Sequence, residues 1–295
     1  MNLYLDTNVY SELDRAAQAD AEAQMSQDEA AWLREGLSAR KITTHPSLPV
    51  LDELVAQMGT DREAVVRKLR MMRALVGFHG MLKQPADIIP EAFAAYAEGK
   101  APPSIVLSEE RRRKVVGPLC EVCSGSTQHD RELIEIASDV KDSKAKWSAS
   151  RAEAGKKSAE KLAWATKTPE ERAAVTLKAW WDLSAEDWAG SIADHLGVGP
   201  GCRQQGLSGL ISLPPVRQFL GVAFSQIHLE AVKAPTRAPH RNDGYDLWHA
   251  CTGSTADAFV TFDRRLADHL DAVKAATGAG SQVFRSVRAL REHLG

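Results

Sequence analysis

The sequence has little that would assign it to a membrane, a disulfide-linked or a strongly charged class of protein. It contains no run of eighteen apolar residues, so we expect no transmembrane helix. Its four cysteines are unevenly spaced over 295 residues, which excludes a disulfide scaffold and favours a reducing compartment. The formal net charge is only −2, so the overall charge does not indicate a polyanionic partner.

What the sequence does contain is the composition of an ordinary globular protein, 44% hydrophobic and 26% charged. A chain of this length can bury a sizeable core, in one enlarged domain or in two. The chain begins with a β-prone run rather than with a basic segment followed by an apolar one. We therefore expect no signal peptide and a cytoplasmic location.

Acidic residues follow two β-prone runs, one at each end of the chain. The first run, MNLYLD, ends on Asp6, and a later run, AFVTFD, ends on Asp263. Two parallel strands of this kind place both carboxylates at the same edge of a sheet, where ligands of α/β proteins gather. Asp246 opens a predicted helix just before the second run, and Glu53 lies in the first turns of another predicted helix.

These four acids predict a metal site. Carboxylates brought close together repel one another unless a cation neutralises them, and hard divalent cations prefer oxygen ligands. Taken singly, an aspartate after a strand is more often a helix N-cap or a solvated turn residue. The joint pattern of the four acids favours a cation site built to hold phosphate.

The rest of the chain reads mostly as helices. Lys41–Thr44 is a short β-prone run, and residues 83–90 and 197–206 are predicted loops because they are rich in proline or glycine. Capping boxes are expected where glutamate follows a hydroxyl residue by three positions, at Ser26 and at Thr60. The spacing of Trp180, Trp181 and Trp188 suits packing in a helical core.

Three segments resemble the PIN-domain nucleases: LDTNVYSEL at residues 5–13, LPVLDEL at 48–54 and YDLWHACTGSTADAFVTFDRRLA at 245–267. The resemblance implies an α/β fold, a three-layer α/β/α arrangement around a parallel sheet. Residues 1–99 and 211–295 would form the PIN-like core. Residues 100–210 have no counterpart in the family and would form a mostly α-helical insertion.

The resemblance also implies a site and a reaction. Mg²⁺ or Mn²⁺ would be held by Asp6, Asp246 and Asp263, with Glu53 helping directly or through water. Asp52 is an alternative to Glu53, and Asp243 to Asp246. Asn8 and Thr261 match positions that support the site by hydrogen bonding. The implied activity is metal-dependent endoribonuclease hydrolysis of RNA phosphodiesters, which needs no side-chain nucleophile.

The resemblance is closest to toxin-type members, which implies a toxin or defence nuclease. An antitoxin or other regulatory protein would then be a partner, and pairing into a homodimer is compatible with the family. The alternative is a non-catalytic RNA-binding or scaffold protein on a degenerate PIN-like core. A phosphatase with an aspartate nucleophile ranks lower, since such enzymes carry a second acid where this chain has Asn8.

The insertion carries two further patterns. Eight basic and three acidic residues lie between Val140 and Lys167, and RRRK lies at 111–114. Candidate RNA-binding residues are Arg112, Arg113, Lys156 and Lys157, although a solvated helix face explains the charge better. Cys120 and Cys123 could bind zinc with His129 or Cys202, but a single C-x₂-C pair is better explained by buried free thiols.

Overall fold

A computed structural model describes residues 1–136, 138–139, 142, 160, 166–233 and 243–295. The described part has an α/β fold built on a four-stranded, all-parallel sheet of order β2-β1-β3-β4. The strands are β1 (Asn2–Leu5), β2 (Thr43–Thr44), β3 (Ala258–Val260) and β4 (Gln282–Phe284). This confirms the expected α/β class and the parallel sheet, and the arrangement is consistent with three layers.

The two central strands, β1 and β3, pair with each other in parallel. Leu3, Tyr4 and Leu5 of β1 lie opposite Ala258, Phe259 and Val260 of β3. All six side chains are buried, as expected of parallel strands that are covered on both faces. The register brings the residues after β1 and β3 to the same end of the sheet, and the amide of Asp6 donates to the carbonyl of Val260 at 3.1 Å.

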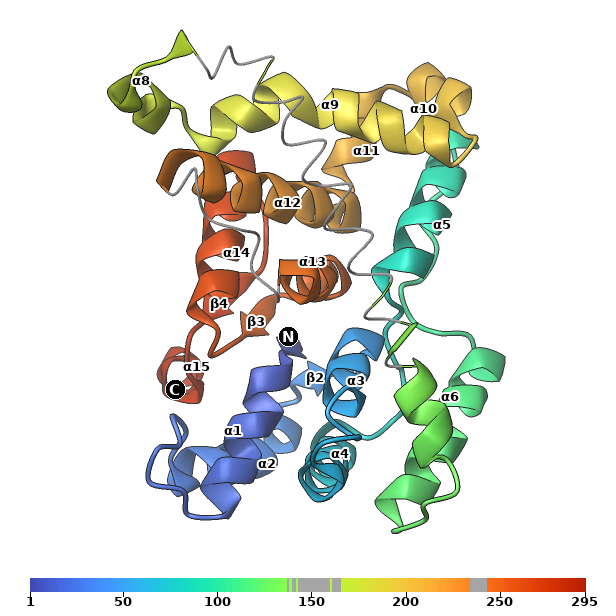
Figure 1. The fold of residues 1–295 in the computed structure, drawn as a ribbon, viewed down its shortest axis with the longest axis vertical. Coiled ribbons are helices and arrows are strands. Elements are labelled where there is room, and N and C mark those ends of the chain that lie inside the picture. Colours follow the sequence, from blue (N-terminus) through green and yellow to red (C-terminus); the bar gives the residue numbers. More distant parts are fainter. Residues whose placement is uncertain (137, 140–141, 143–159, 161–165, 234–242) are drawn as a thin grey trace.

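Helices make up most of the described chain and surround the sheet. In Figure 1, α1, α2 and α4 lie at one end of the molecule and α9 and α10 at the other. None of the described helices is long and apolar enough to cross a membrane. Their bounds, with one short 3₁₀ turn at Gly253–Thr255, are α1 Thr7–Ala17, α2 Gln27–Ala39, α3 Leu48–Val55, α4 Arg62–Val76, α5 Pro85–Ala97, α6 Glu109–Cys123, α8 Pro169–Ala174, α9 Leu177–His195, α10 Gly199–Gln205, α11 Leu207–Ser212, α12 Pro214–Lys233, α13 Asp243–Thr252, α14 Arg264–Thr277 and α15 Val287–Leu294.

The described helices between residues 100 and 210 pack against helices on either side of them in the sequence. Helix α6 packs on α4, α10 on α5, and α9 on α12 and α14. Trp180 is fully buried, and the rings of Trp181 and Trp188 meet Phe224 of α12 edge to face. The prediction that these tryptophans serve packing is confirmed. Buried residues of α6, α9 and α10 belong to the same hydrophobic core as β1 and β3.

The predicted loop at residues 83–90 is wrong, because α5 begins at Pro85 and continues through Pro90. Pro85 is in the first turn, where a helix needs no amide donor. Further along, Ile88, Ile89 and Phe93 are buried on one face. Burial of that apolar face outweighs the hydrogen bond that Pro90 cannot donate.

The predicted loop at residues 197–206 is also wrong, because Gly199–Gln205 form α10. Gly197 and Gly206 have positive φ and end α9 and α10, whereas Gly199 and Gly201 lie inside α10 and allow close packing. A Cβ on Gly201 would lie 2.9 Å from Cβ of Ala97 in α5, so only glycine allows this approach of the two helices. The thiol of Cys202 in α10 is buried and lies 3.6 Å from the carbonyl oxygen of Phe93.

The two predicted capping boxes had different outcomes. At Ser26 the box is formed, since the Glu29 amide donates to Ser26 Oγ at 3.2 Å and the Ser26 amide to Glu29 Oε2 at 2.7 Å. At the start of α4 the N-cap is Asp61 instead of Thr60. The Thr60 hydroxyl donates to the carbonyl of Gln57 and closes the preceding turn.

Candidate functional site

Asp6 lies at the carboxyl end of β1, as predicted, and caps the N-terminus of α1. Its side chain is buried, with 1% of the residue exposed. Oδ1 accepts from the Thr7 amide at 2.7 Å. Oδ2 accepts from the Thr261 hydroxyl at 2.7 Å and from the Asn8 amide group at 3.2 Å. The two supporting residues expected from the resemblance, Asn8 and Thr261, therefore both hold the Asp6 carboxylate.

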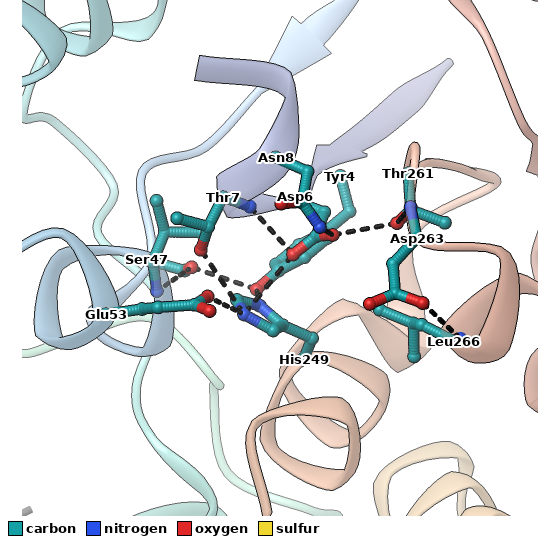
Figure 2. Close-up of polar contacts among 11 residues, drawn as sticks. Tyr4, Asp6, Thr7, Asn8, Ser47, Glu53, His249, Thr261, Asp263 and Leu266 are labelled. Atoms are coloured by element: carbon teal, nitrogen blue, oxygen red, sulfur yellow. Dashed lines mark hydrogen bonds and ion pairs between the residues drawn. The ribbon is translucent and has the colours of Figure 1, made fainter. Parts of the chain in front are cut away.

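Glu53 and His249 meet Asp6 at this edge of the sheet. His249 Nε2, on α13, lies 3.1 Å from Glu53 Oε2 on α3 and 3.3 Å from Asp6 Oδ1. One ligand atom of each of these residues lies within 4.8 Å of the others. Figure 2 shows the histidine ring between the two carboxylates. We call Asp6, Glu53 and His249 the acid–histidine cluster.

A hydroxyl pair lies behind the histidine ring. Tyr4 Oη lies 2.8 Å from His249 Nδ1 and 3.0 Å from Ser47 Oγ. Burial raises the pKa of the Tyr4 phenol well above its usual value, so Tyr4 keeps its proton and remains a hydrogen-bond donor. Ser47 also caps α3 by accepting from the Val50 amide at 3.4 Å. The same serine thus orients both the helix that carries Glu53 and the tyrosine behind His249.

The electrostatics of the cluster disfavour an uncompensated charge on Asp6. Burial raises the pKa of the Asp6 carboxyl, and the neighbouring Glu53 raises it further. His249 and the hydrogen bonds from Thr261 and Thr7 act in the opposite direction and lower it, but less than burial and Glu53 together raise it. A cation bound between Asp6 and Glu53 would remove this penalty.

Asp263 lies close to the cluster but is not part of it. Its side chain caps α14 by accepting from the amides of Arg265 and Leu266 at 2.8 and 3.2 Å. Thr261 connects it to Asp6, because the Thr261 hydroxyl donates to Asp6 and accepts from the Asp263 amide at 3.0 Å. Asp6 and Asp263 therefore both follow a strand and both cap a helix at the same edge of the sheet, as the sequence predicts.

The remaining predicted acids occupy different positions. Asp246 is buried, with 4% exposed, one helical turn before His249 on α13. It is outside the group of three ligand atoms. Glu53, not its neighbour Asp52, contacts His249. The side chain of Asp243 lies outside the described part of the chain.

Those candidate RNA-binding and zinc-binding residues that the structure describes do not join the site. Arg112 and Arg113 both pair with Glu109 on the surface of α6. Lys156 and Lys157 lie outside the described residues. In the described ranges, neither Cys120 nor Cys123 belongs to a group of metal-ligating atoms. Burial and the neighbouring Cys120 raise the pKa of the Cys123 thiol, which favours the free-thiol interpretation.

The sequence predicts for His249 a packing or capping role, with a position from which it could approach a phosphate, and not its place at the centre of the site. The signal was present in DLWH, where Asp246 and His249 are three positions apart and so lie on one face of a helix. Tyr4 and Ser47 carried no signal at all, since a tyrosine in an apolar strand and a serine before a helix have ordinary structural explanations.

Comparison of the chain with protein-family models, with curated proteins and with solved structures gives no match in any of the three. The class that the fold and the site define is therefore a structural one, an α/β protein with a buried carboxylate–imidazole cluster at the carboxyl ends of its central strands. Any assignment of function rests on the chemistry of this cluster.

Proposed function

We propose that the protein is a metal-dependent endoribonuclease on a PIN-like core, and that the acid–histidine cluster is its metal centre. The observation that carries the proposal is the convergence of Asp6, Glu53 and His249, which bring one ligand atom each within 4.8 Å of one another. Convergent carboxylates at the carboxyl ends of parallel strands are where α/β enzymes bind phosphate through cations.

The residues present fit a divalent cation. Mg²⁺ and Mn²⁺ both bind carboxylate oxygens, and Mn²⁺ binds an imidazole nitrogen more readily than Mg²⁺ does. Burial and Glu53 raise the pKa of Asp6, so the cluster is under electrostatic strain that a cation relieves. Asp6 and His249 side chains are each 2% exposed, whereas Glu53 is 24% exposed, so access from solvent is on the Glu53 side.

Each residue then has a role. A bound divalent ion supplies positive charge that stabilises the phosphoryl oxygens and makes water a better nucleophile at neutral pH. Asp6 and Glu53 would hold the ion beside His249, while Thr261 and Asn8 hold the Asp6 carboxylate in place. Asp263 follows Thr261 by two residues and supplies a further carboxylate at this edge of the sheet, and Asp246 is buried one helical turn before His249 on α13. A toxin or defence role, restrained by a regulatory partner, would account for the resemblance of residues 5–13 to toxin-type nucleases.

The proposal is tested by incubating total RNA and Mn²⁺ in separate reactions with the unchanged full-length protein, with the Asp6→Asn variant and with the Asp263→Asn variant. The control is Asp182→Asn, which changes an aspartate that pairs with Lys178 on the surface of α9. We expect cleavage by the unchanged protein and by the control, none by Asp6→Asn, and none by any of them after addition of EDTA.

Cleavage that resists EDTA, or that persists in Asp6→Asn, would contradict the metal-dependent mechanism. If RNA binds but is not cut by any form, the alternative of a non-catalytic RNA-binding protein is favoured. The Asp263→Asn arm decides whether Asp263 belongs to the catalytic site or serves only as the cap of α14.

A further inference from the structure

The imidazole of His249 is held from both sides. The residue is 1% exposed, and each ring nitrogen faces defined partners. Nδ1 faces the Tyr4 hydroxyl, and Nε2 faces the carboxylates of Asp6 and Glu53 and, at 3.4 Å, the Thr7 hydroxyl (Figure 2). A ring fixed in this way is directed at the point where the two carboxylates converge.

A charged ring donates from both nitrogens, to Tyr4 and to a carboxylate, and is the metal-free alternative; for a neutral ring, two hydrogen-bond arrangements satisfy the groups behind it. In one, Ser47 donates to Tyr4 and Tyr4 donates to Nδ1, so the neutral ring carries its proton on Nε2 and donates to a carboxylate. In the other, Nδ1–H donates to Tyr4 and Tyr4 donates to Ser47, which leaves the lone pair of Nε2 directed at Asp6 and Glu53. The hydroxyl groups need only rotate to support either arrangement.

The second arrangement is the one that a metal ligand requires. In this arrangement Nε2 can accept a long hydrogen bond from the Thr7 hydroxyl, but its lone pair is repelled by the two carboxylates until a cation lies between them. A hydrogen bond from the far ring nitrogen to an oxygen is the usual way in which proteins orient a ligating histidine. Tyr4 supplies that oxygen, and Ser47 in turn orients Tyr4.

We propose that His249 is itself a metal ligand, oriented by the Tyr4–Ser47 hydroxyl pair, and that it makes the site select a first-row transition-metal ion such as Mn²⁺ over Mg²⁺. The inference rests on the metal centre of the proposed function and deepens it. It also departs from the all-carboxylate site that the sequence resemblance implies. Imidazole is a good ligand for transition-metal ions, whereas Mg²⁺ prefers oxygen and retains its water.

The test measures binding of Mn²⁺ and of Mg²⁺ to the full-length protein without RNA, and records the electron spin-echo signal of nitrogen coordinated to Mn²⁺. The variants are His249→Gln and Tyr4→Phe. Tyr96→Phe is the matched control, because the Tyr96 hydroxyl donates to the Gly206 carbonyl at 2.6 Å and not to the cluster.

We expect the unchanged protein to bind Mn²⁺ more tightly than Mg²⁺ and to give the nitrogen signal. His249→Gln loses the signal, and its Mn²⁺ affinity falls toward its Mg²⁺ affinity. Tyr4→Phe keeps the signal but binds Mn²⁺ about 10–100-fold more weakly, as is usual when the hydrogen bond that orients a metal ligand is lost. Tyr96→Phe leaves both affinities unchanged.

A protein that binds Mn²⁺ without a nitrogen signal would overturn the inference, as would His249→Gln with unchanged or higher Mn²⁺ affinity. The imidazole would then serve only as a donor that neutralises the acids. Failure to bind Mn²⁺ at all would also overturn it. RNA cleavage separates this inference from the proposed function: a nitrogen signal without cleavage contradicts only the nuclease, and cleavage that depends on Asp6 without the signal contradicts only the role of His249.

Discussion

At the scale of single residues, Asp6 combines structural support with electrostatic cost. Its carboxylate caps α1 and accepts hydrogen bonds from Thr7, Asn8 and Thr261, all of which stabilise the folded chain. Its burial beside Glu53 nevertheless raises its pKa, which means that the charged form is disfavoured in the folded state. A residue that destabilises the metal-free fold is typical of a functional site.

Because the buried Asp6 carboxylate is disfavoured in its charged form, we expect Asp6→Asn to stabilise the metal-free protein at neutral pH. Because the pKa of Asp6 is raised on folding from its usual value of 3.8, stability is lost as the pH rises through the folded-state pKa. The asparagine variant does not titrate, so we expect its free energy of unfolding at pH 7 to exceed that of the unchanged protein by roughly 1–3 kcal/mol, since each tenfold change in the acid dissociation constant corresponds to about 1.4 kcal/mol. The advantage should shrink as the pH falls toward 4.

Urea unfolding in EDTA at several pH values measures this difference. Asp263→Asn is the control, since its side chain is half-buried and asparagine is also a good N-cap, so we expect little change. An Asp6→Asn variant that is less stable than the unchanged protein at pH 7 would show that the hydrogen bonds to the carboxylate outweigh its desolvation.

At the scale of elements, α3 positions Glu53 and depends on Ser47 for its start. Pro49 lies in its first turn, and Ser47 accepts from the Val50 amide at 3.4 Å. Ser108 caps α6 in the same way, accepting from the Arg111 amide at 3.4 Å, but at the surface. The two serines therefore form a matched pair that differs in burial and in the contact of Ser47 with Tyr4.

We expect Ser47→Ala to destabilise the protein by about 1–3 kcal/mol and Ser108→Ala by about 0.5–1 kcal/mol. Both variants lose a helix cap, but only Ser47→Ala also leaves the buried Tyr4 hydroxyl with one partner fewer. Thermal or urea unfolding of the two variants measures the difference. Equal losses would mean that the Ser47–Tyr4 hydrogen bond contributes nothing beyond the cap.

At the scale of the whole molecule, the acid–histidine cluster joins segments that are far apart in the sequence. Asp6 follows β1, Glu53 is on α3, and His249 is on α13, which packs against α3. An ion bound by all three residues holds these segments together, and the unfolded chain offers no comparable site. Metal binding should therefore stabilise the entire fold.

We expect Mn²⁺ to raise the melting temperature of the unchanged protein and not that of Asp6→Asn. At a free concentration about 100 times the dissociation constant, binding to the folded state alone contributes about 2.7 kcal/mol. Differential scanning calorimetry with and without Mn²⁺ measures the shift, and Asp182→Asn should behave as the unchanged protein does. A melting temperature that does not change when Mn²⁺ is added would argue against a metal centre formed by the cluster.

The sequence by itself determined the features that depend on neighbouring residues. Two apolar runs that end on an acid predicted that Asp6 and Asp263 follow strands of one parallel sheet, and the structure confirms that placement. The Ser26 capping box was predictable for the same reason. Local hydrogen bonding and side-chain alternation are encoded within a few residues, so they can be read without the fold.

Only the tertiary structure decided which side chains meet. Thr261 and Asp6 are 255 positions apart, and the partners of His249 come from three elements, so no local pattern encodes their contact. Helices α5 and α10 likewise formed against local proline and glycine signals, because burial of Phe93 and the close contact at Gly201 outweigh them. Packing energies between distant segments selected these arrangements, which is why the central histidine emerged only from the folded chain.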